Sequence, residues 1–208
     1  MKCSFFLLLL IGVVFFFYRG LLLQEQGRYN EALESYSTAI RYRKTLSIAY
    51  LNLAIVMTHL NQREHAKQIY RHCTQIDSTG LKNLRLHETT KISALYNLGR
   101  MYADEGNFEK ALKTFQEAIS RMPSYYPAQS LFNIIGEMHW KLNQSQEAEV
   151  WFRKSLRLKS DHIPVHLTYA KMLAKLNRTN EADQMYRKAL LINSSDIIIY
   201  QHYGKNLC

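Results

Sequence analysis

The stretch YNLGRMYADEGNFEKAL, residues 96–112, places small residues close to large aromatic ones. Gly99, Gly106 and Ala111 each lie within a few positions of a tyrosine or a phenylalanine. A single amphipathic helix on a surface does not need this alternation, because its exposed face has room for side chains. Two closely packed helices do need it, since one must leave space for a side chain of the other. The stretch therefore predicts a tightly packed helical pair.

The same pattern recurs with a period of 34 residues, numbered here from Ile92 as position 1. Position 8 is glycine or alanine, at Gly20, Ala54, Gly99, Gly136, Ala170 and Gly204. Position 20 is alanine, at Ala32, Ala66, Ala111, Ala148 and Ala182. Position 24 is aromatic, at Tyr36, Tyr70, Phe115, Phe152 and Tyr186. Position 15, between the two helices, is a residue that tolerates a left-handed backbone, at Gly27, Asn61, Gly106, Asn143 and Asn177.

This pattern resembles the tetratricopeptide repeat (TPR), a helix–turn–helix unit of the same length. The resemblance implies an all-α, right-handed superhelical solenoid of about five repeats and a partial sixth. We expect TPR 1 to TPR 5 at residues 13–46, 47–80, 92–125, 129–162 and 163–196, and the partial sixth at 197–208. An insertion at residues 81–91 interrupts the period and is expected to extend the preceding helix or to form a loop. Because neighbouring repeats share one core, we expect a single elongated domain.

The chain carries 27 Lys and Arg residues against 17 Asp and Glu, a formal net charge of +10. Acidic residues gather at the start of each predicted second helix, and basic residues gather at its end. That order complements the helix dipoles and is typical of a solvated face. The charge therefore favours a solvated surface over a nucleic-acid-binding or lipid-binding patch, and no nucleic-acid partner is expected.

The sequence shows no pattern of a catalytic, metal or cofactor site. His162 and His166 are four residues apart, but Pro164 and the predicted repeat turn separate them, and no cysteine or carboxylate cluster completes a metal site. Cys73 occupies a small core position and is expected to be inert. A glycine-rich phosphate loop, a Ser-His-Asp set and paired carboxylates are also missing from the sequence. We therefore predict no catalytic centre, no metal and no cofactor.

A binding surface can be predicted instead, because the first helix of each repeat lines the concave groove of a TPR superhelix. The expected groove residues are Leu51, Ile55, His59, Tyr96, Arg100, Asp104, Asn133, Glu137, Trp140, Lys141, Lys171 and Lys175. The ligand would be an extended peptide or a partner helix, anchored by Tyr96 and Trp140. Arg100, Lys141 and Lys171 would contact acidic groups. The alternative is that Trp140 only covers neighbouring helices.

Two groove types known from TPR proteins can be compared with this sequence. The two-carboxylate clamp of chaperone-tail adaptors is not reproduced in successive repeats. O-GlcNAc transferase is more similar, because it carries asparagine at position 6 of most repeats to hold a peptide backbone. Position 6 is asparagine at Asn52 and Asn97 but becomes Ile134, Thr168 and His202 in the later repeats. The asparagine series is therefore incomplete.

The N-terminal segment KCSFFLLLLIGVVFFFYRG has an apolar run from Phe5 to Tyr18. This length is short for a transmembrane helix and suits the core of a signal peptide. Residues 1–18 are therefore predicted to be a hydrophobic leader, either a signal peptide or a short membrane anchor. The alternative is that residues 13–24 form the first helix of TPR 1, since Gly20 and Leu23 keep the repeat register.

Three segments, LYNLGRMYADEGNFEKAL, AQSLFNIIGEMHWKL and SDHIPVHLTYAKMLA, resemble the repeat region of the transmembrane and TPR-repeat (TMTC) proteins. That family is implicated in the O-mannosylation of cadherins in the endoplasmic reticulum. The resemblance implies a lumenal recognition array, belonging to a transferase whose membrane half carries the chemistry. No catalytic residue can be carried over, and the chain is expected to be a fragment or a short isoform. The alternative is a free-standing cytosolic TPR adaptor.

Sequons for N-glycosylation occur at Asn143, Asn177 and Asn193. The first two lie at position 15 of their repeats, in the predicted turn. Position 17 is aromatic in TPR 1 and TPR 3 but is Ser145 in TPR 4 and Thr179 in TPR 5, and these two residues complete the sequons. We therefore predict glycans on Asn143 and Asn177, with Asn193 as a third candidate.

Overall fold

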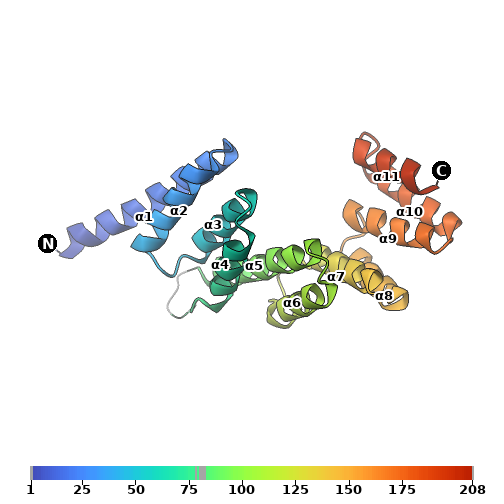
Figure 1. Ribbon diagram of the computed structural model, residues 1–208, viewed down its shortest axis with the longest axis horizontal. Helices are drawn as coiled ribbons and strands as arrows, with labels where there is room; N and C mark the ends of the chain where they lie inside the picture. Colours follow the sequence, from blue (N-terminus) through green and yellow to red (C-terminus); the bar gives the residue numbers. More distant parts are fainter. Residues whose placement is uncertain (1, 78, 80–82, 208) are drawn as a thin grey trace. The chain divides into compact units, whose positions relative to one another are not determined.

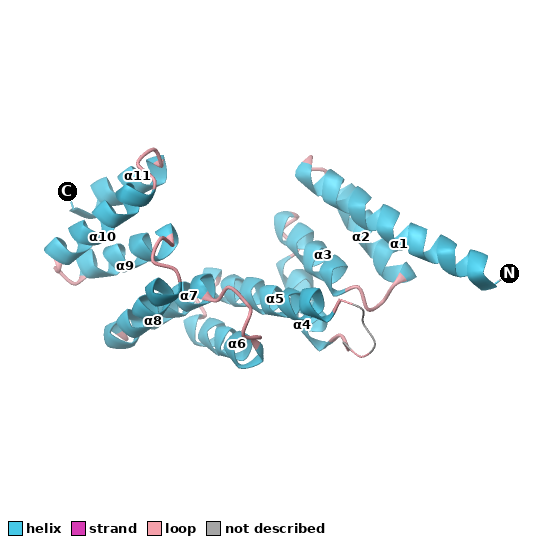
Figure 2. Ribbon diagram, turned by 180° about the vertical axis from the view of Figure 1, so that it is seen from behind, coloured by secondary structure: helices cyan, strands magenta, loops and turns pink. Residues whose placement is uncertain are grey.

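The structure is a computed structural model that describes residues 2–77, 79 and 83–207, with side chains from residue 11 to residue 205 of these ranges. The described residues form eleven α-helices and no strand (Figures 1 and 2). The helices are α1 (Lys2–Glu25), α2 (Tyr29–Tyr42), α3 (Ser47–His59), α4 (Arg63–Gln75), α5 (Leu84–Asp104), α6 (Phe108–Arg121), α7 (Gln129–Lys141), α8 (Ser145–Leu158), α9 (Ile163–Lys175), α10 (Thr179–Ile192) and α11 (Ile197–Leu207).

The helices group into two compact units. The first unit consists of Met1–Glu105 and Gln116–Ser124, and the second consists of Gly106–Phe115 and Tyr125–Cys208. Helix α6 therefore contributes its first half to the second unit and its last residues to the first. Each unit is described by itself below.

Consecutive helices pack as pairs within each unit. Helix α1 packs against α2 and α3 against α4 in the first unit, and α7 packs against α8 and α9 against α10 in the second (Figure 1). The turn inside each of these four pairs contains a residue with a positive φ angle, at Gly27, Asn61, Asn143 and Asn177, and so does the turn between α5 and α6, at Gly106. The left-handed backbone predicted for position 15 is confirmed.

In TPR 1 and TPR 4 the glycine at position 8 lies directly against the aromatic ring at position 24. A Cβ atom added to Gly20 would lie 2.6 Å from Cε1 of Tyr36, and one added to Gly136 would lie 2.7 Å from Cε1 of Phe152. No side chain fits at such distances unless the ring moves. The rings at position 24 and the alanines at position 20 are all buried. The spacing first read from residues 96–112 therefore corresponds to helix-to-helix contacts in TPR 1 and TPR 4.

The insertion lengthens the first helix of TPR 3, which differs from both expectations for residues 81–91. Helix α4 ends at Gln75, and α5 begins at Leu84 and continues without a break through the repeat. The start of α5 is fixed by Asn83, whose side-chain oxygen accepts a hydrogen bond from the backbone N–H of Leu86 at 3.1 Å. Residues 81 and 82 lie outside the described residues.

Helix α1 contains both the apolar leader and the first helix of TPR 1. Val13 and Leu23 are buried, and the ring of Phe16 stacks on Tyr42 with centroids 5.8 Å apart. Arg19 donates a hydrogen bond to the Ser35 hydroxyl at 3.0 Å, so its charge stays at the surface of the pair. Residues 13–25 therefore occupy the first-helix position, while targeting by residues 1–18 stays a prediction. Among the residues that the structure describes, no helix combines the length and the apolar character needed to cross a bilayer.

The contact between positions 8 and 24 can be tested with Gly136→Ala. We expect this change to lower the free energy of unfolding by about 1–3 kcal/mol through overpacking, because the new Cβ would meet the Phe152 ring. Urea unfolding followed by circular dichroism measures the effect. Gly204→Ala is the matched control, since it lies at the same repeat position with nothing within 4 Å of its added Cβ. Alanine there should be neutral or stabilising, and equal losses in both variants would contradict the ring contact as the cause.

Position 20 offers a second test, Ala148→Leu. Ala148 is fully buried, so leucine should cost about 1–3 kcal/mol of unfolding free energy by the same overpacking. Glu147→Leu, at the exposed neighbouring residue on α8, controls for the added apolar surface. A neutral result for Ala148→Leu would contradict the assigned repeat register.

Candidate functional site

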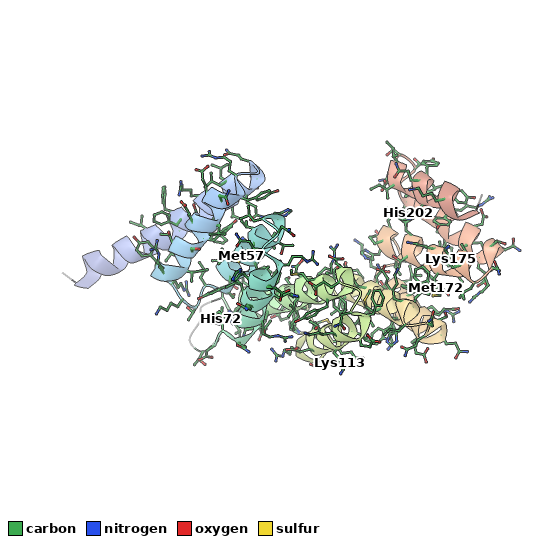
Figure 3. All side chains as sticks on the ribbon, viewed as in Figure 1. Met57, His72, Lys113, Met172, Lys175 and His202 are labelled. Atoms are coloured by element: carbon green, nitrogen blue, oxygen red, sulfur yellow. The ribbon has the colours of Figure 1, made fainter. Side chains whose placement is uncertain are left out.

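The predicted groove residues lie on the first helices of the repeats, in both units. In the first unit, α3 carries Leu51, Asn52, Ile55 and His59, and α5 carries Tyr96, Asn97, Arg100 and Asp104. In the second unit, α7 carries Asn133, Glu137, Trp140 and Lys141, and α9 carries Lys171 and Lys175. Lys175 is labelled in Figure 3. The two sets are treated separately.

Two of the residues on α3 are buried rather than open to a ligand. Leu51 is 8% exposed and belongs to the core that contains Ala54 and Leu98, and Asn52 is 9% exposed. The reason is that α3 contacts α2, α4 and α5. A polypeptide on this unit would therefore contact Ile55 and His59 rather than Leu51.

The two asparagines at position 6 make hydrogen bonds inside the scaffold. Burial raises the pKa of the Tyr36 hydroxyl to about 12, and a hydrogen bond from the side chain of Asn52 partly offsets this rise. Asn97 donates from Nδ2 to the backbone carbonyl of Ser93, 2.9 Å away. In this structure both amides are therefore engaged inside the scaffold, and binding of a peptide backbone by them stays a prediction.

Position 17 of one repeat contacts position 13 of the next. The Tyr29 ring stacks on His59 with centroids 4.7 Å apart and planes 1° apart, and Arg63 lies 4.0 Å from the Asp104 carboxylate. In the second unit, the ammonium of Lys141 lies 6.0 Å from the centroid of the Phe108 ring. These pairs join successive repeats at the ends of the groove-facing helices.

Trp140 is half-buried and lies close to two lysines. Its indole packs against the core formed by residues such as Phe152 and Tyr169. The ammonium of Lys141 lies 5.7 Å from the ring centroid and that of Lys171 lies 6.0 Å from it, both within cation–π range. Trp140 therefore packs against the core of its unit and also lies within reach of two cations.

Asn133 adds an unsatisfied amide to the same unit. Its Nδ2 lies 3.5 Å from the Thr168 hydroxyl, and its Oδ1 is buried without a hydrogen-bond partner among the described residues. Glu137, one helical turn further along α7, is half-buried and is the acidic member of the predicted set in this unit.

The two histidines considered for a metal site have different partners. His166 donates from Nε2 to the Ser160 carbonyl at 2.7 Å, whereas His162 Nε2 lies 3.4 Å from the Ser130 hydroxyl. Burial lowers the pKa of both imidazoles, with the nearby charge of Lys159 adding to the effect at His162. Within the described residues, no group of three or more His, Cys, Asp or Glu side chains could hold a metal ion.

Cys73 is a fully buried residue, as its repeat position predicted. Its thiol donates a hydrogen bond to the Ser47 carbonyl, with 3.4 Å between sulfur and oxygen. Burial raises the pKa of the thiol to about 12, far from the range of a reactive thiolate. This cysteine contributes to packing.

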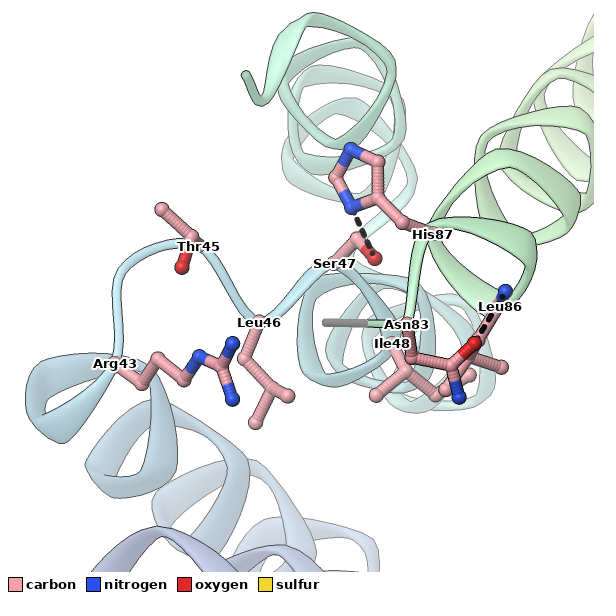
Figure 4. A pocket seen from close by; sticks show the side chains of 8 residues that line it. All are labelled: Arg43, Thr45, Leu46, Ser47, Ile48, Asn83, Leu86 and His87. Atoms are coloured by element: carbon pink, nitrogen blue, oxygen red, sulfur yellow. Dashed lines mark hydrogen bonds between the residues drawn. The ribbon is translucent and has the colours of Figure 1, made fainter. Parts of the chain in front are cut away.

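A small pocket beside α3 contains a residue that the repeat pattern could not indicate, His87. The pocket is lined by Arg43, Thr45, Leu46, Ser47, Ile48, Asn83, Leu86 and His87 (Figure 4). His87 Nδ1 lies 3.0 Å from the Ser47 hydroxyl, and Nε2 lies 3.2 Å from the Ile76 carbonyl. Burial lowers the pKa of this imidazole. His87 thus joins the insertion to the repeat before it, and its place outside the period explains why sequence reasoning missed it.

The three sequons lie in two kinds of local structure. Asn143 and Asn177 are exposed, with φ angles of 61° and 60°, directly before α8 and α10. Asn193 is the C-cap of α10, and its Oδ1 accepts hydrogen bonds from the backbone N–H and the hydroxyl of Ser195, at 3.2 and 3.0 Å.

Family models match most of this helical array. Models described as tetratricopeptide repeat match residues 90–161 and residues 47–79 and 163–196. A model described as TPR repeat matches residues 20–59.

Curated relatives point to one group of TPR proteins. The chain is 44% identical over 111 residues to the protein O-mannosyl-transferase TMTC2 of Mus musculus and of Homo sapiens, a match that covers 53% of this chain. It is 32% identical over 191 residues, 74% of this chain, to protein O-mannosyl-transferase Tmtc2 of Drosophila melanogaster. The matches span 13% of the two mammalian proteins and 20% of the Drosophila protein.

Solved structures share the fold at low sequence identity. Pseudomonas aeruginosa pilF superposes with a TM-score of 0.73 at 21% identity, covering 92% of this chain and 81% of that one. YrrB, described as a TPR protein with an unusual peptide-binding site, gives a TM-score of 0.61 at 18% identity, covering 91% and 90%. Repeat spacing, helix packing and these matches agree, and the chain belongs to the tetratricopeptide-repeat family.

Proposed function

We propose that this chain is a protein-interaction array that binds partner or substrate polypeptide along its first helices, as the repeat region of a TMTC-like O-mannosyl-transferase. TPR folds generally bind proteins or peptides, and the similarity to TMTC2 connects this array to a transferase. The chain would supply recognition, and the transfer chemistry would belong to another part of such an enzyme.

The observation that carries this proposal is the surface around Trp140. A half-buried indole beside lysines combines an apolar anchor with charged groups, the features that dominate protein interfaces. The titratable side chains buried in the described structure, such as Cys73 and His166, are instead held in packing contacts. The arrangement therefore supports binding rather than catalysis.

The proposed location is the lumen of the endoplasmic reticulum, and the proposed substrates include cadherins. Both proposals rest on the resemblance to the TMTC family. Entry into that compartment would be directed by the apolar residues 5–18. The competing outcome is a cytosolic adaptor, which the glycosylation test below would reveal.

Groove binding can be tested by site-specific photo-crosslinking. Random peptides displayed on phage are first selected on the wild-type chain, and the best is synthesised. The crosslinker p-benzoylphenylalanine is then placed at Arg100 of the first unit or at Glu137 of the second, both on groove faces. We expect the peptide to crosslink at one of these positions and not at Arg157, an exposed control on α8. Crosslinking only at Arg157, or failure to select any peptide, would contradict groove binding.

The compartment can be tested by glycosylation. We expect the protein expressed in mammalian cells to lose apparent mass on endoglycosidase treatment, and Ser145→Ala and Thr179→Ala each to remove one glycan. These changes abolish the sequons without replacing Asn143 or Asn177, whose left-handed backbone glutamine would strain. Ser145→Thr and Thr179→Ser change the same side chains but keep the sequons, so they control for effects on folding and should retain both glycans. A well-expressed protein without any shift would favour the cytosolic adaptor.

A further inference from the structure

The groove-facing positions of the second unit carry an unusual excess of lysine. They comprise positions 2, 5, 9, 12 and 13 of the repeats in α7, α9 and α11. Their charged residues are Glu137 against Lys141, Lys171, Lys175 and Lys205. In the first unit, the same positions carry Glu25, Arg100 and Asp104. The excess positive charge therefore belongs to the second unit.

These lysines have no acidic partner among the residues that the structure describes. Lys141, Lys171 and Lys175 form no ion pair with any described residue, although Glu137 lies one turn from Lys141. Many bases on second helices or at their N-caps behave differently. They are neutralised in the pairs Lys67–Glu105, Arg71–Glu117, Arg178–Glu149 and Arg187–Asp183. The groove-facing charges are thus available for an external anion.

Lys175 lacks the contact between position 17 and position 13 that restrains Lys141. Lys141 is held near the ring of Phe108, but the residue equivalent to Phe108 in the next repeat is Ser145. Serine offers no ring for the ammonium of Lys175, which stays exposed on α9 (Figure 3).

Two ammonium groups near one indole attract the ring but repel each other. Lys141 and Lys171 lie 5.7 and 6.0 Å from the centroid of the Trp140 ring. A carboxylate bound between them would remove the repulsion, and an apolar side chain beside it would cover the exposed part of the indole. We propose that this lysine–tryptophan surface, formed by Trp140, Lys141, Lys171 and Lys175, binds acidic peptide segments that carry a neighbouring apolar side chain.

This proposal rests on the proposed function and specifies its ligand class. Complementary charge would give selectivity and faster association, with the indole supplying the apolar contact. Glu137 would oppose the ligand, because it places a negative charge beside the same surface.

The test uses fluorescein-labelled peptides of equal length and the full chain. One peptide carries Asp and Glu around a single Phe, and its partner has Asn and Gln in place of the acids. Fluorescence anisotropy is measured at low and high salt. We expect the acidic peptide to bind at least about fivefold more tightly at low salt, with the difference shrinking as salt rises.

Four single variants locate the interaction. Lys171→Gln and Lys175→Gln should each weaken binding of the acidic peptide by about two- to fivefold, the usual range for partly exposed ion pairs. Glu137→Gln should tighten it by a similar factor. Lys154→Gln is the matched control: it removes the same charge and a similar contact, since its ammonium lies 4.2 Å from the Trp151 ring centroid, but it is on α8.

Several results would overturn the inference. If the neutral peptide binds as tightly as the acidic one, the preference for acidic ligands is refuted. Groove binding itself is judged separately, by the crosslinking test. An equal loss in Lys154→Gln would show attraction to the overall charge alone, and no binding of either peptide would exclude the surface as a peptide site. A single-stranded oligonucleotide that binds more tightly through Lys171 and Lys175 would make this a nucleic-acid surface instead.

Discussion

The closest helix contacts depend on the contact between a small residue at position 8 and an aromatic ring at position 24. At Gly20 and Gly136 the ring lies so close that even a methyl group would overlap it. The same contact buries the ring, because the partner helix covers its face. Rings of this size contribute much of the apolar area that a single helical pair can bury. The repeated residues at positions 8 and 24 thus set the spacing between paired helices and also form part of the core.

A second, weaker contact joins one repeat to the next and is chemically variable. Position 17 meets position 13 as a stacked pair at Tyr29 and His59, and as an ion pair at Arg63 and Asp104. Because each of these contacts lies near the surface, its loss costs little stability. Sequence can therefore change there, as it does at Ser145. One substitution both completes a sequon and leaves Lys175 without a ring to contact.

The repeat period predicted the features that follow from local geometry. The left-handed turns, the buried alanines and the buried rings all lie where the spacing placed them. The period carries no information about segments outside it, so the continuation of α5 through residues 84–91 and the contacts of His87 could not be derived. Burial of Leu51 was also missed, because position alone does not reveal that α3 contacts three helices. The glycans and the bound polypeptide remain predictions.

The separation between scaffold and surface explains why similarity of fold says little about ligands here. Proteins with 18–21% identity share the helical array, because small residues, rings and turns are enough to build it. The groove-facing positions are not needed for that packing and can differ even within one chain. In the first unit they carry nearly balanced charge, with His59 and Asp104 engaged by neighbouring repeats. In the second unit they leave lysines beside a half-buried indole. Under the proposed function, specificity would therefore arise from the side chains that the repeat pattern leaves unconstrained.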